Sequence, residues 1–209
     1  MPVRANGGEL RNSMTAALLA YVRRARGEEA VVLLLEEAGE RRPLAELEDR
    51  TGWSSHAATL RLFESAAVLF DDPHIGREVG AEVYLRERPR EVIERLRALG
   101  RPADVVRYVA ETADRQSAIT EMSCIASGIR WALVSARTVA PFERHAIFCD
   151  YISGMLAAVP TMFDVGLADV TEVECQALGA SRCLYLVSWE TASSDAADAE
   201  IDLLRGRLD

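Results

Sequence analysis

Lysine is absent from this sequence of 209 residues, and histidine occupies three positions. All 24 basic residues are arginines, against 33 aspartates and glutamates, so the formal net charge at pH 7 is −9. Proteins bind nucleic acid largely through clustered basic side chains that release counterions, so this balance argues against a broad nucleic-acid surface. Arginine without lysine, together with abundant alanine, indicates a GC-rich bacterial genome and carries no functional information.

Long apolar runs are also missing. No stretch approaches the roughly 20 apolar residues of a membrane span, and residues 1–10 lack the basic and apolar segments of a secretion signal. We therefore expect a cytoplasmic protein without a membrane partner. Cysteine is scarce as well, with four residues. Because cytosolic thiols stay reduced, we expect metal binding or plain burial rather than disulfides.

Apolar residues make up 49% of the sequence, which is enough for one sizeable hydrophobic core. From residue 13 to about residue 116 the apolar side chains recur at helical spacing, which predicts a set of short helices. Glycines and prolines interrupt that pattern at Gly27, Pro43, Gly52, Pro73, Pro89 and Pro102.

From residue 117 onward the pattern predicts strand, strand, helix, strand, strand. Ser127-Gly128 marks a turn between the first pair, and residues 169–175 and 182–189 form the second pair. Between the pairs, Pro141 can open a long helix over residues 142–163, which Pro160 ends or kinks.

We divide the chain into a helical part at 1–116, an α/β part at 117–190, and a linker at 191–209 that begins a signalling helix. In this last segment Ile201, Leu204 and Leu208 repeat at coiled-coil spacing. A surface helix that packs back on the domain would show the same spacing.

One group of residues has the chemistry of a metal site. Glu172, Cys175 and Cys183 form the pattern E-x2-C-x7-C across the last predicted hairpin, and Cys149 lies on the preceding helix. Thiolates are strong ligands for Zn²⁺, and four protein donors make a closed structural site. We expect Arg182 and the loop amides at 176–181 to offset the negative charge. Alternatively, the cysteines are simply core residues.

The segments F-C-D-Y-I-S-G-M-L-A-A-V-P and V-E-C-Q-A-L-G-A-S-R-C-L-Y-L-V-S-W resemble the vinyl-reductase-type (V4R) small-molecule-binding domain of phenol-responsive bacterial activators. The resemblance covers residues 117–190. It implies structural zinc at Cys149, Glu172, Cys175 and Cys183. It also implies the α+β fold of the heme-nitric-oxide-sensor and TRAPP-subunit superfamily, in which N-terminal helices pack with a four-stranded antiparallel sheet and a crossing helix.

The same resemblance implies a homodimer and a small apolar or aromatic ligand held between the sheet and the helices. Candidate ligand-binding residues are Met122, Trp131, Phe148, Tyr151 and Met155, which could equally be core. The segment R-A-L-G-R-P-A-D-V-V-R resembles sensor regions that precede diguanylate cyclase domains. We therefore expect a C-terminal output domain for cyclic-dinucleotide signalling or transcription.

Three other functions can be compared with the sequence. A heme sensor of this superfamily needs an axial histidine and a Tyr-x-Ser-x-Arg signature, and only Ser127 and Arg130 hint at it, at the wrong spacing. An enzyme is not expected, because the sequence shows neither a G-x-G-x-x-G motif after a strand nor a paired nucleophile and base. The alternative function is a helix-turn-helix DNA-binding regulator, with Thr51-Gly52 at its turn and a recognition helix offering His56, Thr59 and Arg61.

Overall fold

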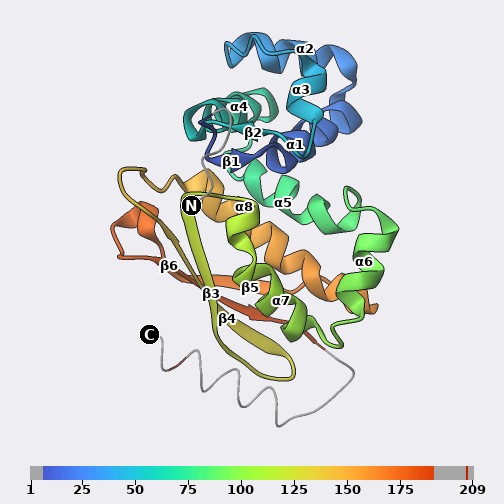
Figure 1. Ribbon diagram of the computed structural model, residues 1–209, viewed down its shortest axis with the longest axis vertical. Helices are drawn as coiled ribbons and strands as arrows, with labels where there is room; N and C mark the ends of the chain where they lie inside the picture. Colours follow the sequence, from blue (N-terminus) through green and yellow to red (C-terminus); the bar gives the residue numbers. More distant parts are fainter. Residues whose placement is uncertain (1–6, 191–205, 207–209) are drawn as a thin grey trace.

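An antiparallel sheet of four strands, in the order β3-β4-β6-β5, underlies one half of the molecule (Figure 1). The computed structural model describes residues 7–190 and residue 206. The strands form two hairpins, and the second inserts its last strand beside β4, so β6 lies in the sheet interior with all six residues buried. The strands are β3 (Thr120–Ser127), β4 (Trp131–Thr138), β5 (Asp169–Glu174) and β6 (Cys183–Ser188).

Helix α8 (Ala146–Ala158) connects the two hairpins and crosses one face of the sheet. Helix α5 (Ile75–Leu85) packs directly on α8, and glycines make this close approach possible. A methyl group at Gly80 would overlap the carbonyl oxygen of Tyr151, and one at Gly154 would overlap that of Arg77. The two helices therefore meet backbone to backbone.

The other half of the molecule is built from short helices that stand above α5 in Figure 1. A two-residue ribbon ties the start of the chain to this half, where Leu10 pairs with Ser54 and Arg11 with Trp53. The remaining elements are β1 (Leu10–Arg11), α1 (Asn12–Arg26), α2 (Glu28–Glu37), α3 (Leu44–Glu48), β2 (Trp53–Ser54), α4 (His56–Phe70), α6 (Arg90–Arg97) and α7 (Pro102–Glu111).

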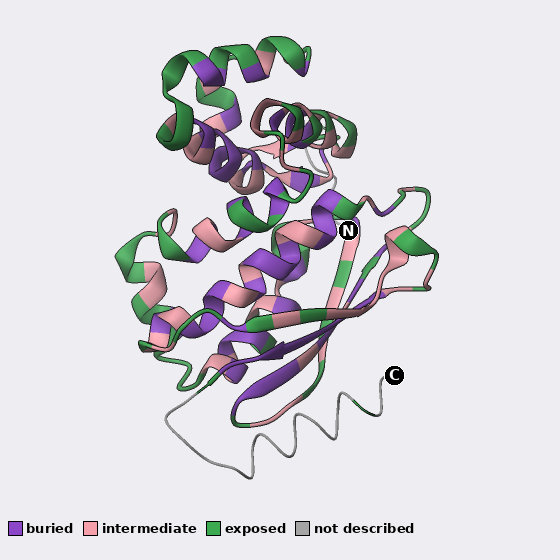
Figure 2. Cartoon of the chain, turned by 180° about the vertical axis from the view of Figure 1, so that it is seen from behind, coloured by how far each residue is buried: buried purple, intermediate pink, exposed green. Residues whose placement is uncertain are grey.

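One buried apolar cluster runs through both halves, from Leu18 and Phe63 among the helices to Val134 and Tyr185 in the sheet. Figure 2 shows that α8 and the inner strands β4 and β6 are mostly buried, whereas the outer strands β3 and β5 and the outermost helices expose more of their surface. The predicted α+β architecture and the four-stranded antiparallel sheet are confirmed. The segment 191–209, with its expected linker and signalling helix, lies outside the described residues apart from residue 206.

The helix predicted over residues 142–163 begins later than expected. Residues 141–145 form a loop, and α8 starts at Ala146, where the His145 ring nitrogen accepts a hydrogen bond from the amide of Ile147 at 3.3 Å. This loop lets Arg144 turn inward, which an early helix start would prevent. The end is as predicted, because α8 gives way to a 3-10 turn, Val159–Phe163, at Pro160.

The stretch Ala146–Phe163 is long and apolar enough to cross a membrane by length and composition, which corrects the expectation that no segment comes close. In the structure 61% of it is buried inside the protein. It packs against α5, the sheet and its own 3-10 continuation. Its apolar character is therefore accounted for by its position as the core helix.

Candidate metal centre and adjoining cavity

The four metal ligands predicted from the sequence come together. Cys149 lies in the first turn of α8, Cys183 opens β6, and Glu172 and Cys175 lie on β5 and just after it. Their donor atoms all lie within 4.8 Å of one another. Cys149 and Cys183 are buried, and the other two are half-buried. The site therefore fastens α8 to the second hairpin.

A β-bulge places two of these ligands on the same face. Residues three apart on a regular strand point to opposite sides, so Glu172 and Cys175 could not both face α8. The register shifts between Glu172, which pairs with Tyr185, and Glu174, which pairs with Leu184. The extra residue, Val173, resets the alternation. Glu172 and Cys175 then lie on the α8 side, and Glu174 lies on the other.

The sulfur spacing matches a tetrahedral zinc site. The Cys149 Sγ lies 3.7 Å from the Cys175 Sγ and 3.6 Å from the Cys183 Sγ. A disulfide would require about 2.05 Å. Two sulfurs each about 2.3 Å from a tetrahedral Zn²⁺ would lie about 3.8 Å apart. In addition, the Glu172 Oε1 is buried and has no hydrogen-bond partner among the described residues. A metal ion would give this oxygen the partner it lacks.

Arg144 supplies the positive charge beside the cluster. Its side chain is buried, and its Nε donates to the Cys149 Sγ at 3.3 Å. A terminal nitrogen donates to the Tyr185 hydroxyl at 3.2 Å. The backbone amide of Gln176 adds a bond to the Cys183 Sγ at 3.3 Å. Hydrogen bonds of this kind orient metal ligands and offset the charge of thiolates.

Arg182 does not take the part expected from the sequence. Its side chain is 42% exposed and pairs with Glu174 at 3.3 Å. Neighbouring residues on a strand point to opposite faces, so Arg182 faces away when Cys183 faces α8. The expectation that loop amides contribute is correct for Gln176.

The electrostatics of the cluster differ from one sulfur to the next. The hydrogen bond with Cys149, helped by Arg144 and the Gln176 amide, lowers the pKa of Cys183 to about 4 despite burial. Burial raises the pKa of Cys175 and of the Glu172 carboxyl. The hydrogen bond that lowers the pKa of Cys183 raises that of Cys149, and a bound cation would offset the burial that disfavours charge on these donors.

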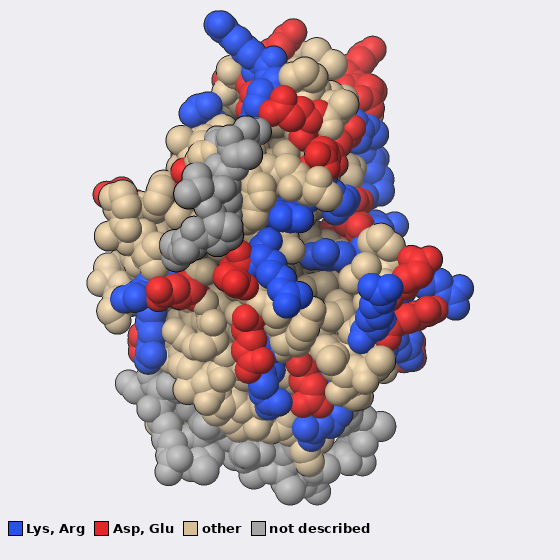
Figure 3. Space-filling view, in the orientation of Figure 1, with Lys and Arg blue, Asp and Glu red and all other residues tan. Residues whose placement is uncertain are grey.

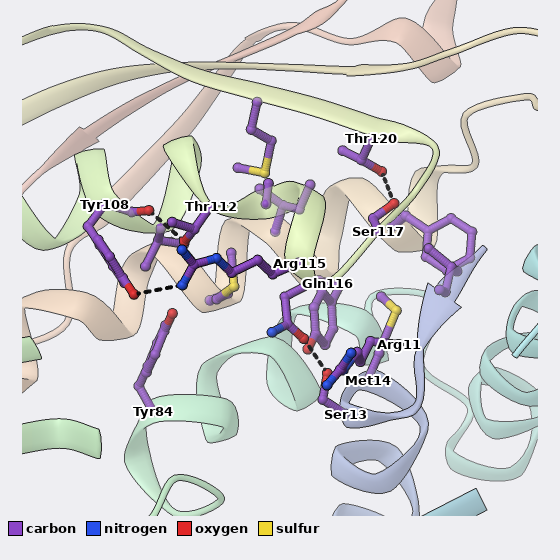
Figure 4. Close-up of a pocket in the computed structure, with 18 of the residues that line it drawn as sticks. Arg11, Ser13, Met14, Tyr84, Tyr108, Thr112, Arg115, Gln116, Ser117 and Thr120 are labelled. Carbon is purple, nitrogen blue, oxygen red and sulfur yellow. Dashed lines mark hydrogen bonds between the residues drawn. The ribbon is translucent and has the colours of Figure 1, made fainter. Parts of the chain in front are cut away.

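A cavity of about 440 Å³ adjoins the metal cluster, within the size range of small-molecule sites (Figure 4). It lies where α8, α7 and β3 meet the N-terminal segment. Four of the five candidate ligand-binding residues line it, namely Met122, Phe148, Tyr151 and Met155.

Trp131 is the exception. It packs with Leu133, Val173 and Leu186 in a separate cluster on the opposite face of the sheet, so it does not reach the cavity. The reason is the alternation of β4, in which Ala132 and Val134 belong to the core between sheet and helices.

Several cavity residues escaped the sequence analysis because they come from the helical half. Tyr84 lies at the end of α5, Tyr108 on α7, and Arg115 follows α7 in a 3-10 turn. Arg115 donates to the Tyr108 hydroxyl at 3.5 Å (Figure 4). Neither their spacing nor their composition differs from that of ordinary amphipathic helices, so no sequence signal distinguishes them.

Arg144 belongs to both sites. It contributes to the cavity wall and contacts Cys149 through its Nε. Helix α8 also serves both, because Cys149 faces the metal cluster while Tyr151 and Met155 face the cavity. A change in the cavity can therefore reach the metal cluster through one side chain and one helix.

No family model matches the chain, and a search of curated proteins finds no match. Solved structures do match. An H-NOX protein from S. oneidensis in the Fe(II)NO ligation state has a TM-score of 0.67 at 12% identity, over 87% of this chain and 100% of that one. An oxygen-binding H-NOX domain related to soluble guanylate cyclases has a TM-score of 0.64 at 14% identity, over 89% and 98%.

An unliganded H-NOX mutant from K. algicida has a TM-score of 0.61 at 8% identity, over 87% and 97% of the two chains. These likenesses show that the chain shares the fold of these H-NOX structures. They confirm the predicted α+β architecture, and the V4R resemblance stays a prediction.

The cavity does not match a heme site. Among the described residues that line it, His56 is the one histidine, and its Nε2 is buried without a hydrogen-bond partner. The ring packs beside Phe142 and Phe148, with centroids 5.7 and 5.2 Å away. These contacts hold the imidazole between two rings, and no Tyr-x-Ser-x-Arg signature accompanies it, so the residues present do not fit a heme site.

The helix-turn-helix alternative loses its recognition surface. His56 is packed among aromatic rings, and the buried Thr59 hydroxyl donates to the Ser55 carbonyl at 3.1 Å. Arg61 donates to the Ala38 carbonyl at 3.3 Å. Two of the three side chains that would read bases, His56 and Thr59, are therefore packed or bonded within the protein, and the exposed Arg61 is held against the Ala38 carbonyl.

Proposed function

We propose that the chain is a cytoplasmic ligand-sensing regulatory domain that binds a small molecule through an apolar cavity and is held together by structural Zn²⁺. The carrying observation is the set of four donors within 4.8 Å, with sulfur separations of 3.6 and 3.7 Å. Four protein donors complete a tetrahedron and leave no position for a substrate. The domain thus acts by binding rather than by catalysis.

In this proposal the signal passes through α8. A ligand in the cavity presses on Tyr151 and Met155 from α8 and on Met122 from β3. The zinc couples the start of the same helix to β5 and β6. A ligand shifts the domain between two packings by as much as its affinity for them differs. The V4R resemblance favours a homodimer and an output domain that reads this shift, for cyclic-dinucleotide signalling or transcription.

The first test is the metal content of the purified full chain, measured by inductively coupled plasma mass spectrometry. We expect one zinc per chain in the wild type and in C124A. Cys124 lies outside the cluster, where its thiol contacts the Ala126 carbonyl at 3.4 Å, so C124A is the matched control. C183A should lose the metal. Wild-type protein that contains no zinc and binds none on titration would refute the proposal.

A further inference from the structure

The cavity carries a charge opposite to that of the whole protein. The chain has a net charge of −9, yet five of the lining residues are arginines, and none of the described lining residues is an aspartate or glutamate. Figure 3 shows basic side chains around a hollow on this face, between the upper helices and the sheet half. The arginines are Arg11, Arg88, Arg95, Arg115 and Arg144.

Among the described residues, none of these five arginines pairs with an aspartate or glutamate; Arg11 instead donates to the Arg50 carbonyl at 3.3 Å and lies over the Trp53 ring. An ion pair neutralises another arginine of α6, because Arg90 pairs with Glu94, whereas Arg95 of the same helix has no such pair among the described residues. Among the described residues, no ion pair includes Arg88, Arg95 or Arg115. Arg144 is already engaged by Cys149 and Tyr185. Arg88, Arg95 and Arg115 come from the α5–α6 loop, α6 and the turn after α7, and all three line the cavity.

Arg88 gives the most direct sign of a missing anion. Its guanidinium lies over the Tyr84 ring at 5.6 Å, and its Nε is buried without a hydrogen-bond acceptor among the described residues. Leaving a buried charged donor unsatisfied is costly, so such a group usually meets an acceptor. Arg115 reaches the Tyr108 hydroxyl across the same space (Figure 4).

The rest of the cavity is apolar. Met14, Met122, Met155, Ile152, Leu96 and Val109 contribute to its walls. Methionine side chains adapt to ligands of irregular shape. The site thus joins an apolar chamber to a group of unneutralised arginines, which is the shape and charge of an amphipathic anion.

We infer that the cavity binds a carboxylate with an apolar body, a straight-chain or arylalkanoic acid, with its head group held by Arg88 and Arg115. This inference rests on the proposed sensor function and names its ligand class. A planar carboxylate can accept two parallel hydrogen bonds from a guanidinium, whereas a neutral alcohol of the same body cannot. The arginines therefore select for the carboxylate head group of the ligand, and the methionines select for its apolar body.

The test compares ligands matched in body and different in head group. Isothermal titration of the zinc-loaded chain would use decanoate against 1-decanol, and 3-phenylpropanoate against 3-phenylpropanol. We expect each acid to bind about 10- to 100-fold more tightly than its alcohol, as charge-assisted hydrogen bonds provide. In R88Q and R115Q the ratio of acid affinity to alcohol affinity should fall below about threefold. R107Q is the control, because Arg107 bonds Asp104 and Ser127 away from the cavity.

The possible outcomes distinguish failure of the carboxylate inference from failure of the proposed sensor function. Equal binding of acids and alcohols, unchanged in R88Q and R115Q, would overturn the carboxylate assignment and leave an apolar sensor. No binding of either kind would overturn both. A further outcome would assign the cavity to heme and overturn the inference. In it, added hemin displaces decanoate and gives the absorption spectrum of a histidine-ligated heme, and H56A abolishes that spectrum.

Discussion

The Nε of Arg144 lies 3.3 Å from the Sγ of Cys149, and this contact joins a cavity to the four candidate metal ligands. Arg144 also reaches the Tyr185 hydroxyl on β6, so one buried side chain spans helix, sheet and cavity. In a domain that responds to a ligand, such a residue is placed to transmit a change in either site to the other.

Replacing Arg144 should weaken the metal site. We expect R144M to lower zinc affinity about 10- to 100-fold, as loss of a group that hydrogen-bonds a ligand typically does. The measurement is competition with a chromogenic chelator. The absorption of the cobalt-substituted protein should also shift, because the bond to the Cys149 sulfur is gone. R182M should behave as wild type, since Arg182 pairs with Glu174 instead. Equal affinities in R144M and wild type would contradict this role.

Removing the metal should loosen the second hairpin before the N-terminal helices. Structural zinc contributes about 10–16 kcal/mol in small zinc peptides, which is comparable to the stability of a whole domain. After chelation, hydrogen exchange should rise first in β5, β6 and the start of α8, and added Zn²⁺ should reverse it. Uniform exchange throughout the chain, or none at all, would show that the cluster does not hold these elements together.

Because α5 packs closely on α8, substitution of a glycine at their contact should destabilise the protein. We expect G80A to destabilise the protein by about 2–3 kcal/mol, because the new methyl group overlaps the Tyr151 carbonyl and backbone cannot rotate away. The midpoint of urea unfolding would measure this. G166A is the control, since no atom lies within 4 Å of a methyl group there. A G80A protein as stable as G166A would mean that the helices can separate at no cost.

A carboxylate far from both sites predicts a pH effect. Glu40 accepts hydrogen bonds from the amides of Arg41 and Arg42 and pairs with the Arg42 guanidinium at 2.7 Å. These contacts, led by the Arg42 side chain, lower the pKa of Glu40 from 4.5 to about 2.

A carboxyl whose pKa is lower in the folded state stabilises the protein fully above its unfolded pKa, and this contribution is lost as the pH falls toward 2. We expect E40Q to cost about 1–2 kcal/mol at pH 6 and clearly less at pH 3. Unfolding curves at both pH values would show the difference. E37Q, at an exposed position, should change neither. An E40Q penalty independent of pH would contradict the ion-pair explanation.

The sequence predicted much of the fold because local patterns carried it. Gly27 separates α1 from α2, Pro43 and Pro89 directly precede α3 and α6, and Pro102 opens α7. Alternation predicted the four strands. The helix was predicted to start too early because Pro141 is compatible with a helix start. In the structure a loop with Arg144 turned inward precedes the first helical residue, Ala146.

The four candidate metal ligands were predicted from spacing and resemblance, but the arginine that lies beside them was not. Arg182 is adjacent to Cys183 in the sequence and points to the other face of the sheet, whereas Arg144, in the loop just before α8, reaches the Cys149 sulfur. Trp131 failed as a cavity residue for the same reason, because its face of the sheet depends on register. Adjacency in sequence does not fix the side of a sheet to which a side chain points.

By itself the sequence determined the helices, the strands and the four donor residues, since these depend on local periodicity and on the chemistry of cysteine and glutamate. Only the tertiary structure decided that a bulge at Val173 turns Glu172 and Cys175 to one face, and that arginines from separate helices surround an apolar cavity. Those arrangements arise from contacts between segments far apart in the chain, where packing rather than local preference sets each position.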